Sequence, residues 1–343
     1  MDDRYLENCT IAKTVLMLFV IIGHSISFWN GAWFTALTPE RTSSVYKYLS
    51  IYIGGFHIFA FTMISGYLFY YLRIEKGKYK NGLKFIGVKF KRLIIPFISV
   101  LLVWVIPINQ YFFSYDLKTI VYRYILATNP SQLWFLLMLF WVFIIIWPLA
   151  RIMNEHFCFG VALMLGLYAL GVVGTKICPN YFMIWTSCQY FIFFGMGFYF
   201  RKFKLEYLCK INPLLYIVIY CGVFFIYVFT YDVGNVSTLY KLYSYGIELL
   251  FHLSGALCAF CILQNVGQMR GFNSALVKRL AVYSMPIYLF HEQIIYIVIG
   301  MLNGKINIYV LSILCFFISV TLSYLISKIL FKWKITRFLI GEK

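Results

Sequence analysis

Apolar stretches long enough to cross a lipid bilayer recur along the whole chain. A spanning helix needs roughly 20 predominantly apolar residues. Without water, backbone polar groups must be satisfied within the segment, so each span is expected to be a helix. The sequence therefore predicts an all-α integral membrane protein of about ten transmembrane helices. We place these spans at 10–29, 49–72, 93–113, 133–150, 157–175, 182–200, 213–231, 244–264, 281–302 and 307–329.

The composition agrees with a chain that lies mostly in the membrane. Only 12% of its residues are charged and 62% are hydrophobic, whereas soluble domains carry about 25% charged residues. We expect one transmembrane domain over residues 1–343, without a separate soluble domain. A cleavable signal peptide is not expected, because the first apolar run is long and follows the mixed charges Asp2, Asp3, Arg4 and Glu7.

The basic residues gather in alternate loops. The loop after the second predicted span alone holds Arg73, Lys76, Lys78, Lys80, Lys84, Lys89, Lys91 and Arg92. Of the 30 lysines and arginines, only Arg41, Lys47, Lys118, Arg123, Lys176, Lys241 and Lys305 fall in loops of the other set. Basic loops stay in the cytoplasm, which predicts a multi-pass protein of the inner or plasma membrane with both termini cytoplasmic. The net charge of +18 therefore does not indicate nucleic-acid binding.

The nine cysteines are scattered, mostly within apolar runs. Cys258 and Cys261 form a C-x-x-C pattern, but inside a predicted span this is ordinary helical spacing. No second pair with zinc-site spacing occurs. We therefore expect these cysteines to pack in the core and predict no metal site.

The first apolar stretch, Thr10 to Phe28, carries two ionisable side chains, Lys13 near its start and His24 near its end. Eleven residues are close to three helical turns, so both side chains are expected on nearly the same face, about 16 Å apart along the axis. The charge map puts Lys13 at the inner boundary and His24 in the outer half. A histidine there is either functional or a packing residue that hydrogen-bonds a neighbouring helix.

Further ionisable residues expected inside the bilayer include His57 in the second span, and His291 with Glu292 in the ninth. His57 is a candidate for orienting His24 or a substrate, and an interhelical hydrogen bond explains it equally well. For His291 and Glu292, a structural role and a polar contribution to a site are both open.

Five sequence elements, taken in order, resemble the acyltransferase-3 family of integral membrane acyltransferases. The family's first helix has a basic residue and a histidine separated by ten positions, and later helices carry short polar or aromatic elements. The matching elements are Lys13 with His24; Ser65, Gly66 and Tyr67; Arg92 with Pro96; Trp134, Phe135 and Leu136; and Ser284, Tyr288, Leu289 and His291. The resemblance covers residues 10–291.

The resemblance implies an enzyme that moves an acyl group, most commonly acetyl, from cytoplasmic acyl-CoA to a hydroxyl of an extracytoplasmic or lipid-linked saccharide. His24 is then expected to act as general base or as transient acyl carrier, since an imidazole can do either near neutral pH. Lys13 and Arg92 are expected to bind the phosphates of coenzyme A, although both also fit basic anchors at the membrane boundary.

Other residues of the motifs have supporting roles in this interpretation. Trp134 and Tyr288 are candidates for the wall of the site, and packing is an alternative for Trp134. Ser65 and Gly66 are expected to allow close approach of two helices. Lys13 stands where arginine is commoner in the family, which replaces a planar fork with a point charge.

Two other classes of protein compete with this interpretation. A polysaccharide flippase or exporter, which is not an enzyme, would also use many aromatic residues, but it does not need Lys13 and His24 on one helical face. A glycan polymerase usually has a large outer loop, whereas the longest outer loops here, 30–48 and 114–132, are modest. Some family members carry a fused hydrolase-like domain. None is expected here, so the membrane domain or a partner protein would complete the transfer. A homo-oligomer is left open.

Overall fold

The computed structural model describes residues 2–31, 33–232, 237–266 and 275–342, and these ranges contain helices and connecting segments but no strand. Within them, nine helical stretches are long and apolar enough to span a membrane. They are Asn8–Asn30, Ser44–Glu75, Gly82–Phe113, Ser131–Glu155, Phe157–Ile177, Pro213–Thr230, Leu239–Asn265, Val277–Leu302 and Ile308–Leu330. The predicted all-α multispan membrane fold is confirmed. Arg270, which the charge pattern assigns to the cytoplasmic side, lies outside the described residues.

The remaining predicted span, 182–200, corresponds to α10 (Ile184–Lys202), which is not among the nine stretches. Its sequence is less apolar because it contains Thr186, Ser187, Gln189 and the terminal pair Arg201 and Lys202. It packs against α3 (His57–Tyr70), α8 (Trp134–Glu155) and α9 (Phe157–Ile177). The helix therefore belongs to the interior of the bundle.

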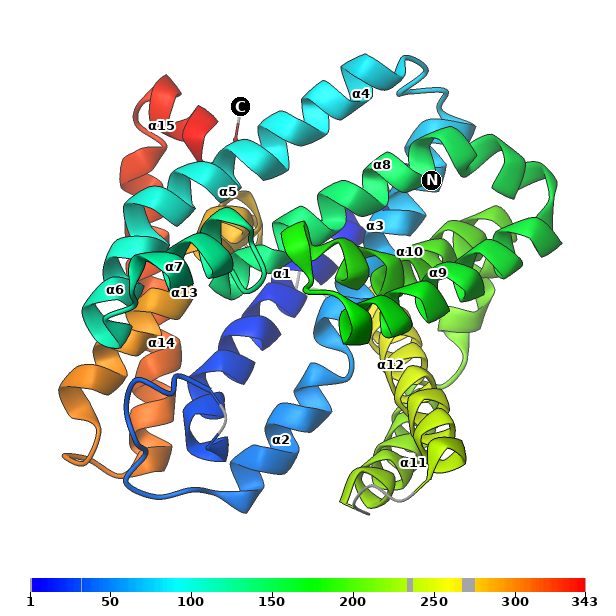
Figure 1. Ribbon diagram of the computed structural model, residues 1–343. Helices are drawn as coiled ribbons and strands as arrows, with labels where there is room; N and C mark the ends of the chain where they lie inside the picture. The colour runs from blue at the N-terminus through cyan, green and yellow to red at the C-terminus, as the bar shows by residue number, and fades with distance from the viewer. Residues whose placement is uncertain (1, 32, 233–236, 267–274, 343) are drawn as a thin grey trace.

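Helix α1 (Asp2–Ser27) lies at the centre of the fold (Figure 1). It contacts α2 (Ser44–Gly54), α3, α12 (Thr238–Val266), α13 (Ala275–Leu302) and α14 (Ile308–Leu330). Helices α11 (Pro213–Asp232) and α12 form a pair that extends away from the rest of the bundle at one end (Figure 1). Residues on α1 can therefore face several helices from distant parts of the sequence.

The second span consists of two helices, α2 and α3, separated at Gly55 and Phe56. A Cβ atom at Gly55 would lie 2.2 Å from the Phe251 ring and 2.4 Å from the hydroxyl of Tyr220. Only glycine fits between these side chains of α12 and α11. The break places His57 at the first position of α3.

The third span is longer than predicted, since it begins at α4 (Gly82–Lys89) instead of residue 93. The helix continues through η3 (Phe90–Ile94), α5 (Ile95–Val100), η4 (Leu101–Val105) and α6 (Ile106–Phe113). The π turns η3 and η4 precede Pro96 and Pro107, where the missing N–H and the proline ring disturb regular α-helix geometry. The expectation that Lys84, Lys89, Lys91 and Arg92 lie in a loop is therefore wrong.

Helices α3 and α10 approach each other through two glycines. A Cβ atom at Gly66 would lie 1.9 Å from the carbonyl oxygen of Phe194, and one at Gly197 would lie 1.8 Å from that of Met63. The predicted role of Gly66 in close helix packing is confirmed. The neighbouring Ser65 is buried and donates a hydrogen bond to the carbonyl oxygen of Phe61 at 3.0 Å.

Shorter elements complete the described chain. They are η1 (Phe28–Asn30), η2 (Tyr71–Glu75), α7 (Leu117–Ile120), η5 (Val121–Ile125), η6 (Ser131–Leu133), η7 (Tyr181–Met183), η8 (Leu205–Lys210) and α15 (Lys334–Leu339). Cys258 and Cys261 lie on α12 within the hydrophobic core, as their helical spacing predicts. The thiol of Cys209 on η8 lies 3.1 Å from that of Cys261.

Candidate active site

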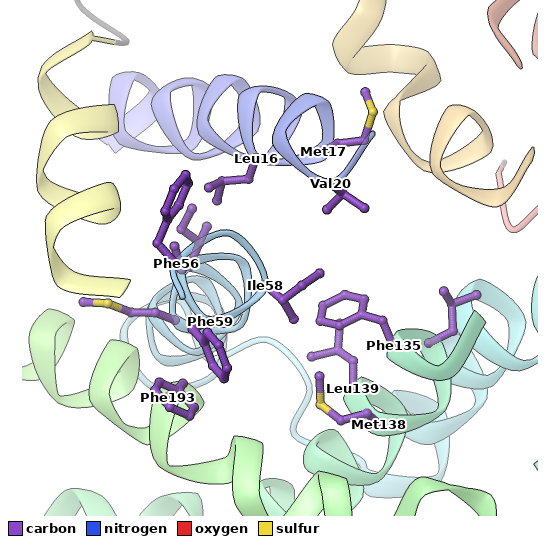
Figure 2. Packing of buried hydrophobic residues seen from close by; sticks show 14 of the residues in the cluster. Leu16, Met17, Val20, Phe56, Ile58, Phe59, Phe135, Met138, Leu139 and Phe193 are labelled. Atoms are coloured by element: carbon purple, nitrogen blue, oxygen red, sulfur yellow. The ribbon is translucent and has the colours of Figure 1, made fainter. Parts of the chain in front are cut away.

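Two adjoining cavities lie beside α1. One, the histidine cavity, has a volume of about 330 Å³ and is lined by His24, His57 and His252 together with aromatic side chains. The other, the basic cavity, has a volume of about 370 Å³ and is lined by Lys13, Lys89 and Arg92. Val20, Ile58 and Tyr288 line both cavities and therefore form the partition between them. In Figure 2, Val20 of α1 and Ile58 of α3 point towards the same space beside Phe135 of α8.

Lys13 and His24 open onto different cavities from the same helix. Lys13 lines the basic cavity and His24 lines the histidine cavity, and Val20, between them in sequence, lies at the partition. This arrangement agrees with the expectation that both side chains share one face of the helix. A single rigid element thus links a cationic group to an imidazole.

His24 contacts a histidine and a carboxylate from α13. Its Nδ1 lies 3.1 Å from Nε2 of His291 and 3.6 Å from Oε2 of Glu292. His291 is fully buried and Glu292 is 3% exposed, whereas the His24 side chain keeps 24% of its surface accessible. Of these groups, His24 is therefore the one that a bound molecule can reach.

The hydrogen bonds of His291 determine which nitrogen of His24 carries a proton. Nδ1 of His291 lies 2.7 Å from the carbonyl oxygen of Tyr288, and because a carbonyl only accepts, this nitrogen must donate. In a neutral imidazole, Nε2 of His291 is then an acceptor, and Nδ1 of His24 donates to it. Nε2 of neutral His24 consequently carries the lone pair.

Glu292 is held on its other side by a further donor. Its Oε1 accepts a short hydrogen bond from the Tyr296 hydroxyl. Trp33 packs against both His24 and Tyr296, with ring centroids 5.2 and 5.0 Å apart. These contacts fix Glu292 beside Nδ1 of His24.

His57 lies at the break between α2 and α3. Its Nδ1 lies 2.6 Å from the carbonyl oxygen of Ile53, so this nitrogen donates and Nε2 of the neutral ring is an acceptor. The imidazole lines the histidine cavity, as the His24 ring does. The structure thus brings His57 and His24 together around one space.

The basic cavity collects three cations from two helices. Lys89 and Arg92 are three residues apart on the third span and therefore lie on neighbouring positions of its surface, and Lys13 comes from α1. The ammonium group of Lys89 lies 3.6 Å from the centre of the Phe143 ring, and that of Lys13 lies 5.0 Å from the centre of the Phe61 ring. Aromatic faces attract such cations.

The two wall residues predicted from the motifs also border the cavities. Trp134 lines the histidine cavity and packs on Tyr190, with ring centroids 5.5 Å apart. Tyr288 lines both cavities and donates a short hydrogen bond to the carbonyl oxygen of Gln132. Gln132 on η6, directly before α8, also donates to the carbonyl oxygen of Leu289 on α13 at 2.8 Å.

Sequence reasoning missed Lys89 and His252. The spacing of Lys89 to Arg92 could have identified the first, had the helix been expected to begin before residue 93. No motif pointed to His252, which enters the cavity from α12. Within the described ranges, no group of three or more His, Cys, Asp and Glu side chains could hold a metal ion.

Comparison with protein families gives one match over nearly the whole chain. A family model described as an acyltransferase domain, of the acyltransferase-3 type, matches residues 7–328. Searches of curated proteins and of solved structures gave no match.

Proposed function

The chain belongs to the acyltransferase-3 family and is a membrane acyltransferase, and from this premise we propose that it transfers an acyl group, with acetyl expected, from cytoplasmic acyl-CoA to a saccharide hydroxyl. The acceptor is an extracytoplasmic or lipid-linked glycan. The alternative of an exporter that is not an enzyme has no support from the family match.

The observation that carries the proposal is the pair of adjoining cavities with Lys13 at one and His24 at the other. Coenzyme A combines anionic phosphates with a long flexible arm that ends in the thioester. Lys13 and His24 are about 16 Å apart along α1, so a donor with phosphates in the basic cavity would extend its arm past Val20 towards His24.

The basic cavity suits the phosphate end of the donor. Lys13, Lys89 and Arg92 are the cations that line it, and charge-assisted hydrogen bonds to phosphate are stronger than neutral ones. Arg92 offers a planar fork for two phosphate oxygens, whereas the lysines offer point charges. Together they would bind a donor that carries several negative charges.

His24 has the geometry of a general base. Nε2 would take the proton of the acceptor hydroxyl while its oxygen attacks the thioester carbonyl carbon. The carbon–sulfur bond then breaks, and the proton passes from His24 to the departing thiolate, which leaves as free coenzyme A. Nδ1–H, directed at His291 and Glu292, holds the ring in the required tautomer, and the carboxylate stabilises the imidazolium that forms transiently.

The same lone pair serves a covalent route. In that case Nε2 attacks the thioester first, and the acyl group passes from His24 to the acceptor hydroxyl in a second step. Both routes consume one acyl-CoA and one hydroxyl and release one thiol. His57, on the neighbouring helix, would orient His24 or the acceptor in either route.

The central experiment measures acyl-CoA turnover by the purified protein. Acetyl-CoA is incubated with and without a glycan extract from the source cells, and coenzyme A is quantified by chromatography, since the nine cysteines would react with a thiol reagent. We expect binding of coenzyme A and its extract-dependent release from acetyl-CoA. Neither binding nor release, with acetyl-CoA or longer acyl-CoAs, would contradict the proposal.

A labelling experiment tests the proposed orientation. In a variant without native cysteines, single cysteines at Lys80 and Lys204 should be protected from an impermeant thiol reagent in intact cells, and one at Thr38 should react. Labelling at Lys80 would place the basic cavity on the outside and exclude a cytoplasmic donor site.

A further inference from the structure

His252 is a half-buried polar group without a role in the reaction proposed above. Of the five histidines in the sequence, His24, His57 and His252 line the histidine cavity and His291 lies directly behind His24. His252 comes from α12, which carries none of the motif residues. An ionisable side chain at membrane depth is a functional candidate by default, so His252 requires an explanation.

A backbone contact between α12 and the helix break sets the position of His252. A Cβ atom at Gly255 would lie 2.5 Å from the carbonyl oxygen of Gly55, so glycine is required for this approach. The His252 ring stacks on Phe59, with centroids 3.9 Å apart and an interplanar angle of 28°. The imidazole is therefore held firmly at the cavity wall.

Both ring nitrogens of His252 have an oxygen neighbour. Nδ1 lies 3.4 Å from the carbonyl oxygen of Gly55, and Nε2 lies 3.8 Å from Oε1 of Glu248, one turn earlier on α12. The second separation is longer than a direct hydrogen bond. Glu248 and Nε2 thus lie at a separation that a bridging hydroxyl group could span with one hydrogen bond to each.

Glu248 does not itself line the histidine cavity but lies beside His252, which does. Its side chain is 42% exposed, compared with 17% for His252. About one turn before Glu248 on α12, the ammonium group of Lys176 lies 4.2 Å from the centre of the Tyr245 ring. Glu248 and Lys176 therefore offer polar groups beside α12 outside the cavity, which a hydrophilic molecule approaching His252 would contact.

We propose that Glu248 and His252 form a positioning pair for the acceptor, which deepens the proposed function and rests on it. The acceptor is a sugar residue with at least two hydroxyl groups. One hydroxyl binds the Glu248–His252 pair, and this contact places another hydroxyl at Nε2 of His24.

The shape and lining of the cavity support this substrate class. A volume of about 330 Å³ is at the small end of ligand sites, which are typically about 300–1,000 Å³, and suits one sugar ring instead of an extended oligosaccharide. Trp134, Tyr190 and Tyr227 supply aromatic faces, while histidines on α1, α3 and α12 supply hydrogen-bonding groups. A ring with both apolar faces and polar edges matches that combination.

The competing explanation is that His252 has only a structural role, in which its Nδ1 hydrogen-bonds the carbonyl oxygen of Gly55. Two substitutions separate the roles, because asparagine places an amide N–H near the position of Nδ1 and glutamine reaches the position of Nε2. His252→Asn should keep the bond to Gly55 and lose the acceptor contact. His252→Gln should preserve part of the acceptor contact.

The experiment compares acceptor transfer with donor binding. Source cells lacking the gene are complemented with wild type, His252→Asn, His252→Gln or Glu248→Gln at matched protein levels, and acylation of their glycans is measured by mass spectrometry. The same proteins are purified to measure coenzyme A affinity and thermal stability. His156→Asn, between α8 and α9 and outside both cavities, is the matched control.

We expect His252→Asn and Glu248→Gln to reduce acylation about ten- to a hundredfold, the cost of losing a hydrogen bond that involves a charged group. Coenzyme A affinity should stay within about twofold of wild type, and His252→Gln should retain more acylation than His252→Asn. Full acylation by His252→Asn would overturn the proposal. Parallel losses of acylation, coenzyme A affinity and stability would also overturn it and assign a structural role. A wild-type protein that neither binds coenzyme A nor changes glycans would instead refute the proposed function.

Discussion

Nε2 of His291 lies 3.1 Å from Nδ1 of His24, and the two rings stack with their centroids 5.1 Å apart. His291 is fully buried, and its own Nδ1 is committed to the carbonyl oxygen of Tyr288. Helix α13 therefore determines which nitrogen of His24, on α1, has a free lone pair. The reactive geometry depends on a contact between residues 267 positions apart.

Replacing His24 should remove the chemical step and leave donor binding intact. His24→Gln keeps similar bulk and some hydrogen bonding but has no group that accepts a proton near neutral pH, so turnover should fall about 10²- to 10⁴-fold. Coenzyme A affinity and thermal stability, measured on the same samples, should match wild type. Turnover above about a tenth of wild type would mean that another group performs the chemistry.

Glu292 should act through His24. Glu292→Gln removes the negative charge beside Nδ1 of His24, so the imidazolium formed during the reaction is less stabilised. The lost charged contact predicts a kcat about ten- to a hundredfold lower with an unchanged KM for acyl-CoA. Glu40→Gln, at an exposed position, is the control, and an unaltered kcat in Glu292→Gln would reject the assigned role.

The length of the apolar stretches predicted the helical membrane fold because lipid leaves the backbone few alternatives. The close packing at Gly66 could likewise be predicted, since small residues commonly mark helix contacts in membranes. The break at Gly55 could not be predicted from the sequence, because it depends on Phe251 and Tyr220, which come from helices far along the chain. Tertiary packing decides where such a span divides.

In the candidate site, too, features within one helix could be predicted, whereas contacts between distant helices could not. Lys13 and His24 share one helix, so their spacing predicted a common face. Lys89 was assigned to a loop because its charge disfavours a membrane helix, but contact with the Phe143 ring offsets that cost. His252 could not be identified from spacing, since its neighbours His24 and His57 lie on α1 and α3.

The basic cavity makes a prediction about the donor. Lys13→Ala and Lys89→Met should each raise the KM for acyl-CoA, about ten- to a hundredfold if a charged phosphate contact is lost. Lys13→Arg should retain much of the activity because the charge is kept. Lys84→Met, an exposed position on α4, is the matched control. An unchanged donor KM in Lys13→Ala would make Lys13 a membrane-boundary anchor.

The contact between α3 and α10 makes a prediction about stability. Gly66→Ala would place a methyl group 1.9 Å from the carbonyl oxygen of Phe194, so the helices must separate, at a cost of about 1–3 kcal/mol. Gly222→Ala is the matched control, because a Cβ atom there meets nothing within 4 Å. Thermal unfolding in detergent should show a lower midpoint for Gly66→Ala only, and equal midpoints would mean that the helices adjust freely.

The partition between the cavities makes the sharpest prediction about their coupling. Val20 is 4% exposed and lines both spaces, so Val20→Trp should enlarge the partition between them and obstruct the proposed path of the donor's arm. If the donor binds in the basic cavity and extends its arm towards His24, this variant should still bind 3′,5′-ADP, which carries the phosphate end of coenzyme A without the arm. Its affinity for acetyl-CoA should fall and its turnover should be lost.

Val218→Trp, at a position 66% exposed on α11, controls for the added bulk. Normal turnover by a folded Val20→Trp protein would show that the acyl group reaches the acceptor by another route.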